Sequence, residues 1–192
     1  MKIGLFFGSF NPIHVGHLII ANYLAEYTDM KQIWFIVSPQ NPFKEKESLL
    51  NEYHRLDLVN TAIEGNNKLK SSDNEFKLPK PSYTIDTLQY LKEKYPKKQF
   101  CLIMVSDNVT SFHKWKNYET ILNQYPIYVY KRNGDEHLAL QNKYPQINFL
   151  DVPLLDVSSS LIRKMIREKK SVRYLLPENV HEQVMKSGYY KS

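Results

Sequence analysis

The sequence contains little cysteine and glycine and no long hydrophobic run. Cys101 is the single cysteine among 192 residues, which excludes an intramolecular disulfide and favours a reducing compartment such as the cytoplasm. Its 6 glycines are too few for a collagen-like chain. Apolar stretches such as Ile33 to Val37 end after a few residues, whereas a membrane helix needs about 20. The N-terminus also lacks a signal-peptide pattern, so we expect a cytoplasmic protein that is neither secreted nor membrane-inserted.

The charge balance is positive without selecting one partner. The chain has 26 lysines and arginines against 20 acidic residues, a net charge of +6, which suits a nucleotide, a nucleic acid or a membrane surface. The basic residues are spread over many segments, and this argues against a nucleic-acid-binding module. With 42% apolar residues, the 192 residues are expected to form one domain, 1–192.

Strand-like and helix-like segments alternate along the chain. Apolar runs predict strands at 2–7, 32–37, 69–72, 100–105, 127–130 and 147–150. Helical spacing between breakers predicts helices at 17–27, 49–63, 84–95, 118–122, 159–169 and 177–186. We expect loops at 39–48 and, apart from 69–72, at 65–81. The alternation predicts an α/β fold, a Rossmann-like doubly wound parallel sheet with helices on both faces, whose ligands bind where strands end.

The strongest motif, GSFNPIHVGH, covers residues 8–17 between the first strand and the first helix. Gly8 permits close approach of the backbone to a ligand. The helix start offers free N–H groups to a phosphate, and His14 and His17 can donate to phosphate oxygens. Alternatively, one histidine caps the helix and the other packs. A zinc site would need a third ligand, and no cysteine or histidine has suitable spacing.

The second motif, VSSSLIR, covers residues 157–163 at another predicted helix start. Serine is common at a helix N-cap, so Ser158 or Ser159 can be structural. Three hydroxyls, a helix N-terminus and Arg163 also form a second anion site. Both interpretations stay open at this point.

Three weaker motifs follow other predicted elements. PSYTIDTL, at 81–88, reads as a helix start capped by Ser82 or Thr84. Lys44 in the loop after the second strand can reach a phosphate or lie on a plain surface. Asp107 follows the third long strand, where it can bind a sugar hydroxyl or magnesium, and Trp115 can stack on a flat ring.

Together these segments carry a resemblance to a known family. GSFNPIHVGH and SSSLIR resemble the two signatures of the nucleotidyltransferase α/β-phosphodiesterase superfamily. PSYTIDTL, Asp107 followed by Phe112 and Trp115, and the tail YLLPENV at 174–180 are similar to segments of bacterial nicotinate-nucleotide adenylyltransferases. The resemblance covers nearly the whole chain except 66–80 and 134–146. It implies one nucleotidyltransferase domain whose C-terminal helices, from about residue 158, carry a phosphate site.

The resemblance implies direct transfer of AMP from ATP to nicotinate mononucleotide, giving nicotinate adenine dinucleotide and pyrophosphate. Mg²⁺ would be bound mainly through the ATP phosphates, with no metal ligand identified among the side chains. Alternatives are the same chemistry on nicotinamide mononucleotide or phosphopantetheine, and a relative that binds nucleotide without catalysis. An oligomer is possible.

The implied site residues fall into three groups. Catalytic roles go to His14, His17 and Arg163. The same three residues and Gly8, Ser9, Phe10, Ser158 and Ser159 would bind ATP. The mononucleotide would be bound by Lys44, Tyr83, Thr84, Asp107 and Trp115.

Two positions depart from the family pattern. Val105 stands where the family usually has glycine two residues before the aspartate. Phe43 precedes Lys44, where the family often has histidine.

Overall fold

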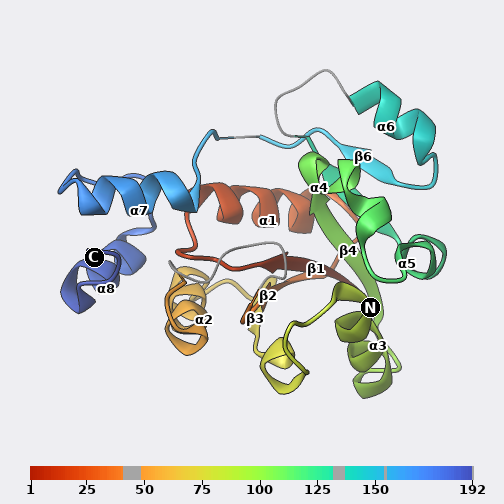
Figure 1. Cartoon of the computed structure of the whole chain (residues 1–192), viewed down its shortest axis with the longest axis horizontal. Coiled ribbons are helices and arrows are strands. Elements are labelled where there is room, and N and C mark those ends of the chain that lie inside the picture. The colour runs from red at the N-terminus through yellow and green to blue at the C-terminus, as the bar shows by residue number, and fades with distance from the viewer. Residues whose placement is uncertain (41–48, 132–136, 154, 192) are drawn as a thin grey trace.

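The computed structural model describes residues 1–40, 49–131, 137–153 and 155–191, and of 137 and 138 the backbone alone. Its centre is a parallel sheet in which the described strands follow the order β3-β2-β1-β4-β5-β6 (Figure 1). The strands are β1 (Lys2–Gly8), β2 (Gln32–Val37), β3 (Leu69–Ser72), β4 (Gln99–Val105), β5 (Ile127–Tyr130) and β6 (Asn148–Leu150). The predicted Rossmann-like α/β fold and its parallel sheet are confirmed.

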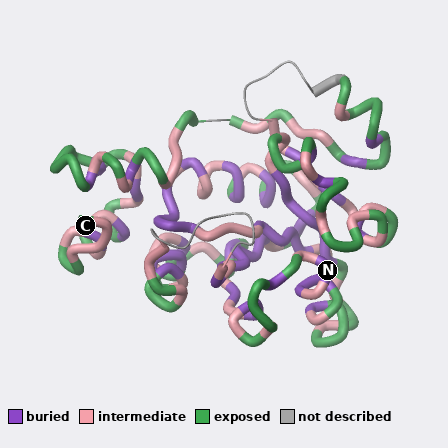
Figure 2. The backbone as a smooth tube through the Cα atoms, in the orientation of Figure 1, coloured by how far each residue is buried: buried purple, intermediate pink, exposed green. Residues whose placement is uncertain are grey.

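Helices cover both faces of this sheet. They are α1 (Val15–Tyr27), α2 (Glu52–Ala62), α3 (Thr84–Lys94), α4 (Ser106–Thr110), α5 (Tyr118–Gln124), α6 (His137–Lys143), α7 (Ser159–Arg167) and α8 (Glu178–Ser187). Buried side chains of α1, α2, α7 and α8 belong to one core, and those of α3, α4 and α5 belong to the other. Figure 2 shows buried residues running through the strands and along the inner sides of these helices.

Alternating side chains of each strand supply the two cores. In β2, Ile33 and Phe35 belong to the core beside α1, whereas Trp34 and Ile36 belong to the core beside α3. Successive side chains of a strand point to opposite faces, so a strand buried on both faces is apolar throughout. This explains why the run Ile33 to Val37 shows no polar alternation.

Several boundaries and short elements differ from the sequence-based expectation. Helix α1 begins at Val15 rather than at 17, and α2 begins at Glu52 rather than at 49. The stretch 65–81 is not a plain loop, because it contains the 3₁₀ turn Asn74–Lys77. The short helices α4 and α6 and the 3₁₀ turn Phe112–Lys114 were also missed. They are too short and polar to show a helical period.

The strand order changes direction between β1 and β4. From β1 the chain continues to β2 and β3, which lie on one side of β1. The strands β4, β5 and β6 lie on the other side. Loops therefore diverge at the carboxyl ends of β1 and β4, which is the place where such sheets bind ligands. Across the described parts of the chain, no helix is both long and apolar enough to span a bilayer.

The buried carboxyl group of Glu75 is hydrogen-bonded to residues at the start of α3. Glu75 is 2% exposed and accepts hydrogen bonds from the hydroxyls of Ser82 (3.0 Å) and Thr87 (2.8 Å). Burial raises the pKa of Glu75 above its ordinary 4.5, against the opposing effect of the hydroxyls, including that of Ser38. The folded state therefore holds this proton more tightly than the unfolded chain does.

This gives a prediction for Glu75→Gln. Between the ordinary pKa and the raised one, the folded state binds more protons than the unfolded state, so the unfolding free energy of the wild type falls as pH rises. Glutamine lacks this titration and keeps an acceptor oxygen. The variant should gain stability relative to the wild type as pH rises from about 4.5 towards neutrality, measured by urea unfolding at a series of pH values.

The exposed Glu64 provides the control. Glu64→Gln removes a carboxyl group from the surface without touching the buried site at the start of α3, and it should not reproduce the effect of Glu75→Gln. Parallel curves for wild type and Glu75→Gln would show that burial of Glu75 does not perturb its titration.

Candidate active site

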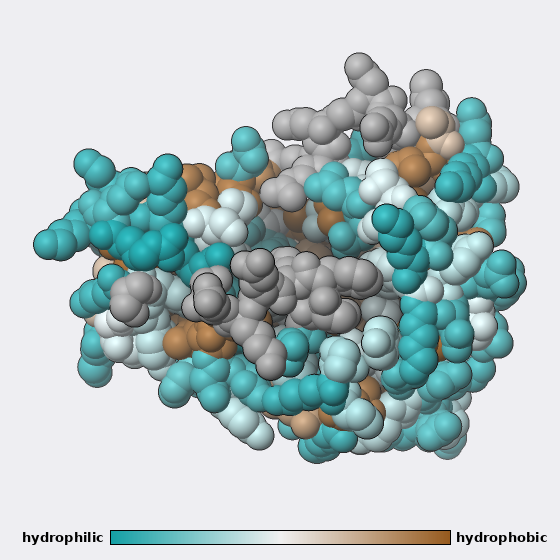
Figure 3. Space-filling model, viewed as in Figure 1, coloured by the Kyte–Doolittle hydropathy of each residue, from teal (hydrophilic) through white to brown (hydrophobic). Residues whose placement is uncertain are grey.

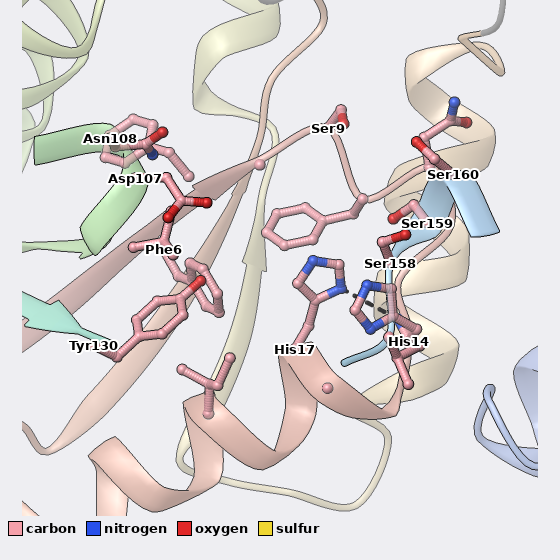
Figure 4. A pocket seen from close by; sticks show the side chains of 18 of the residues that line it. Phe6, Ser9, His14, His17, Asp107, Asn108, Tyr130, Ser158, Ser159 and Ser160 are labelled. Carbon is pink, nitrogen blue, oxygen red and sulfur yellow. Dashed lines mark hydrogen bonds between the residues drawn. The ribbon is translucent and has the colours of Figure 1, made fainter. Parts of the chain in front are cut away.

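A cavity of about 770 Å³ opens at the carboxyl ends of β1 and β4. Its walls come from residues 6–11, the start of α1, Leu49, the end of β4 with the start of α4, Tyr130 of β5, and 155–160 with Arg163. Figure 4 shows His14 and His17 beside the serines of α7, with Asp107 and Tyr130 across the cavity. Segments far apart in sequence therefore meet at the switch point of the sheet.

The two histidines form a stacked pair at the start of α1. Their ring centroids are 3.7 Å apart, with 25° between the planes. His14 is 5% exposed and is the N-cap residue of α1, and its backbone N–H donates to Nδ1 of His17 at 3.3 Å. An Nδ1 atom that accepts this bond carries no proton, so the neutral His17 ring holds its proton on Nε2. His17 therefore combines a structural hydrogen bond with a donor at Nε2.

Glycines make room for two rings beside this pair. A Cβ atom on Gly16 would lie 3.1 Å from Nδ1 of His14, and one on Gly8 would lie 2.8 Å from the ring of Phe10. Phe10 is 2% exposed and packs edge-on against His17, with centroids 5.1 Å apart. Gly8 thus serves internal packing in addition to the close ligand approach expected from the sequence.

The start of α7 is bonded directly to the loop before α1. The hydroxyl of Ser159 donates to the carbonyl of Pro12 at 2.9 Å, and Nη1 of Arg163 donates to the carbonyl of Asn11 at 2.8 Å. Ser158 caps α7 by accepting the N–H of Leu161 at 3.2 Å. The capping interpretation of this motif is therefore correct for Ser158. Ser158, Ser159 and Arg163 nonetheless all line the cavity.

The charges of the cavity are unevenly placed. Arg163 lies on the side of α7, and burial lowers its pKa without removing its charge. Asp107 and Asp156 also line the cavity. Figure 3 shows hydrophilic residues gathered over α7, where Lys164 and Arg167 continue the positive charge. One wall of the cavity is therefore suited to anions.

In the ranges that the structure describes, the carboxylates that line this cavity are those of Asp107 and Asp156. Among the described residues, no group of three or more histidine, cysteine, aspartate or glutamate side chains is arranged to hold a metal ion. Carboxylate oxygens suit Mg²⁺, which usually takes one or two of them together with substrate phosphates. The residues present thus fit an ion that arrives with a polyphosphate.

Tyr83, Thr84 and Trp115 do not line this cavity. Tyr83 is the N-cap residue of α3, and Thr84 begins that helix. Lys116 connects them to the segment of Trp115, because its Nζ lies 4.9 Å from the Tyr83 ring centroid and 2.9 Å from the Asp86 carboxylate. These residues therefore form a second surface, between the start of α3 and the 115–116 segment.

The remaining residues of the site include two that the sequence singled out and three that it did not. Lys44 lies outside the described residues, and Val105 lines the cavity where the family usually has glycine. Sequence reasoning missed Tyr130 and Asn108 of the lining, and it missed Arg55, which is 0% exposed and bonded to the Ser9 carbonyl. An arginine within a predicted helix carries no sequence signal that distinguishes it from a surface residue.

Both the sequence and the fold of this chain are similar to those of known proteins. Residues 5–165 match the family described as Cytidylyltransferase-like. The fold is similar to that of a Plasmodium falciparum nicotinic acid mononucleotide adenylyltransferase solved with NaAD, with a TM-score of 0.83, 20% identity and coverage of 98% and 97% of the two chains.

Relatives with much higher identity extend over the full length. The chain is 50% identical to a probable nicotinate-nucleotide adenylyltransferase of Cytophaga hutchinsonii, over 100% of both chains. It is 52% identical to one of Flavobacterium johnsoniae, also over 100% of both. The family resemblance inferred from the sequence is thus confirmed. The chain belongs to the cytidylyltransferase-like family and, within it, to the nicotinate-nucleotide adenylyltransferases.

Proposed function

We propose that this chain transfers AMP from ATP to nicotinate mononucleotide, with the 770 Å³ cavity as the ATP site. A phosphate oxygen of the mononucleotide attacks the α-phosphorus of ATP. The bond from this phosphorus to the α–β bridging oxygen breaks, and pyrophosphate leaves with the electron pair. The observation that carries the proposal is the direct bonding of the Ser159–Arg163 segment to the Asn11–Pro12 loop beside the two histidines.

The proposed catalytic contribution is positioning and charge stabilisation. Cys101 is a poor candidate for a covalent intermediate, because burial raises its pKa to about 12 and its thiol donates to the Ile3 carbonyl at 3.3 Å. Transfer of a phosphoryl-type group needs oriented donors more than a protein nucleophile. Direct transfer therefore fits the groups that line the cavity.

His17 is assigned to the α-phosphate. Because its Nδ1 accepts the His14 N–H, the neutral ring carries its proton on Nε2, which would donate to a phosphate oxygen as negative charge grows during transfer. His14 contributes a second imidazole against the same phosphates. Gly8, Ser9 and Phe10 line the cavity wall, and their backbone groups would contact the phosphates of the nucleotide.

The start of α7 is assigned to the β- and γ-phosphates. Arg163 supplies positive charge, Ser158 supplies a hydroxyl, and Ser159 supplies its backbone N–H at the helix N-terminus, where the dipole favours an anion. On this proposal the chain acts as one nucleotidyltransferase domain over 1–192, with this C-terminal segment completing the ATP site. Mg²⁺ would bind through the phosphates, with Asp107 as the carboxylate beside it or beside a ribose, and would neutralise charge on the leaving pyrophosphate.

The second surface is assigned to the mononucleotide. The first N–H groups of α3, at Tyr83 and Thr84, have no acceptor within the helix and can bind the nicotinate carboxylate. Trp115 is half-buried against Phe112, with centroids 5.5 Å apart, and its ring would stack on the pyridine. Lys44 would contact a substrate phosphate.

The activity is tested by the release of pyrophosphate from ATP and Mg²⁺ with three acceptors at equal concentration. We expect release with nicotinate mononucleotide to exceed release with nicotinamide mononucleotide by about tenfold or more, because the amide cannot take charge-assisted bonds from the α3 N–H groups. Phosphopantetheine should be inactive. Preference for either alternative acceptor would retain the chemistry but reject the assigned mononucleotide site.

Replacement of His17 tests the assignment of the α-phosphate donor. His17→Ala should lower kcat by about 10²- to 10³-fold, since a donor to the charge that grows in the transition state is lost. Circular dichroism should report an intact fold. His181→Ala, a histidine of α8 away from the cavity, is the matched control and should retain the wild-type rate. Near-normal turnover of His17→Ala would contradict the role.

Replacement of Trp115 separates the two substrate sites. Trp115→Ala should raise the KM for the mononucleotide by about tenfold while leaving the KM for ATP within about twofold, because only the pyridine stack is lost. Steady-state kinetics with each substrate varied in turn measure this. An effect on ATP alone would exclude stacking on the pyridine.

A further inference from the structure

Arg55 of α2 is a fully buried arginine, with 0% of its surface exposed. Its Nε donates to the carbonyl of Leu50 at 2.8 Å, and its Nη2 donates to that of Pro39 at 3.2 Å. Its Nη1 donates to the carbonyls of Ser38, at 2.8 Å, and Ser9. One guanidinium therefore joins the loop after β1, the loop after β2 and the segment just before α2.

The hydrogen-bond partners of Arg55 within the described part of the chain are neutral carbonyl groups. Burial lowers its pKa, yet a guanidinium stays protonated in proteins. Within the described residues no carboxylate is hydrogen-bonded to it, and Glu52 acts on it through charge alone. Carbonyl dipoles solvate the guanidinium but carry no net negative charge. The region around Arg55 therefore keeps a positive electrostatic potential. This potential favours an anion in the cavity that Ser9 lines.

The bond to Ser9 also sets the orientation of the next peptide group. This peptide is trans, so the Ser9 carbonyl and the Phe10 N–H point in opposite directions. Because Arg55 holds the carbonyl, the Phe10 N–H is turned away from Arg55. Phe10 has a φ of 45°, a left-handed conformation that a bulky residue keeps only when its surroundings hold it there.

Arg163 holds the same loop two residues further on, through the Asn11 carbonyl at 2.8 Å. Tyr190, near the C-terminus, interacts with the charges of both Arg55 and Arg163, and burial raises its own pKa. Its hydroxyl is buried and has no hydrogen-bond partner among the described residues. The desolvation of both guanidiniums by burial strengthens their field at a bound anion.

We propose that Arg55 is a positioning residue for the triphosphate: it orients the Ser9–Phe10 peptide so that the Phe10 N–H faces the phosphates, and it places an unneutralised positive charge behind them. Arg55 touches no reacting atom and acts through the loop. The inference rests on the proposed function, in which the ligand of this cavity is ATP.

The test compares ATP with AMP, since AMP lacks the β- and γ-phosphates. Arg55→Lys keeps the charge without the planar set of donors, and Arg55→Gln keeps two N–H donors without the charge. Isothermal titration calorimetry on the full chain, without a second substrate, gives both dissociation constants. We expect ATP affinity to fall about tenfold or more in each variant, and AMP affinity to change about twofold at most.

Several readouts separate positioning from a purely structural role. In turnover, the KM for ATP should rise in the Arg55 variants while that for the mononucleotide stays unchanged. Arg173→Lys is the matched control, because this arginine is exposed and paired with Glu178 at 2.9 Å, and it should retain both affinities. Equal losses of ATP and AMP affinity, or lower thermal stability with unchanged ATP affinity, would overturn the proposal.

The proposed orientation of the Phe10 N–H can also be tested on the wild-type protein, without any substitution. The amide NMR signal of Phe10 should shift with ATP or pyrophosphate and much less with AMP. A Phe10 amide that does not respond to ATP would reject the proposed orientation. Failure of the wild type to release pyrophosphate with any acceptor would reject the proposed function, whereas the comparison of ATP with AMP would still decide the role of Arg55.

Discussion

The carbonyl groups of the loop between β1 and α1 are held from two sides by arginines, and the site depends on this constraint. Arg55 holds Ser9, and Arg163 holds Asn11. A glycine- and proline-containing loop has many conformations of similar energy, and each bond to a charged donor removes some of them. With its carbonyls engaged, the loop presents Phe10 in a left-handed conformation that its own sequence does not favour.

The topology of the sheet determines which segments this constraint can join. The ends of β1 and β4 are adjacent, so the loops that follow them share one edge of the sheet. Helix α7, far along the chain, reaches the same edge and bonds to the Asn11–Pro12 segment. An ATP site at this edge would therefore be incomplete until the C-terminal third of the chain has folded onto the first strand.

The two proposed substrate surfaces differ in how they are held. The cavity side relies on arginines and hydroxyls that bond to backbone carbonyls. The side of α3 relies on Glu75, which accepts from Ser82 and Thr87. Hydroxyl donors suit a buried carboxyl, and carbonyl acceptors suit a buried guanidinium. Each side thus relies on a buried ionisable group that stabilises a helix start or a loop.

The sequence by itself determined the α/β class, the strand positions, the family and the two motifs at 8–17 and 157–163, because apolar periodicity and motif spacing are local properties of the chain. Tertiary structure alone decided that Ser158 is a cap, that Gly16 makes room for His14, and that Tyr83, Thr84 and Trp115 do not line the cavity. It also decided that Arg55 is buried. Whether a guanidinium meets water or backbone carbonyls depends on loops that are remote in sequence.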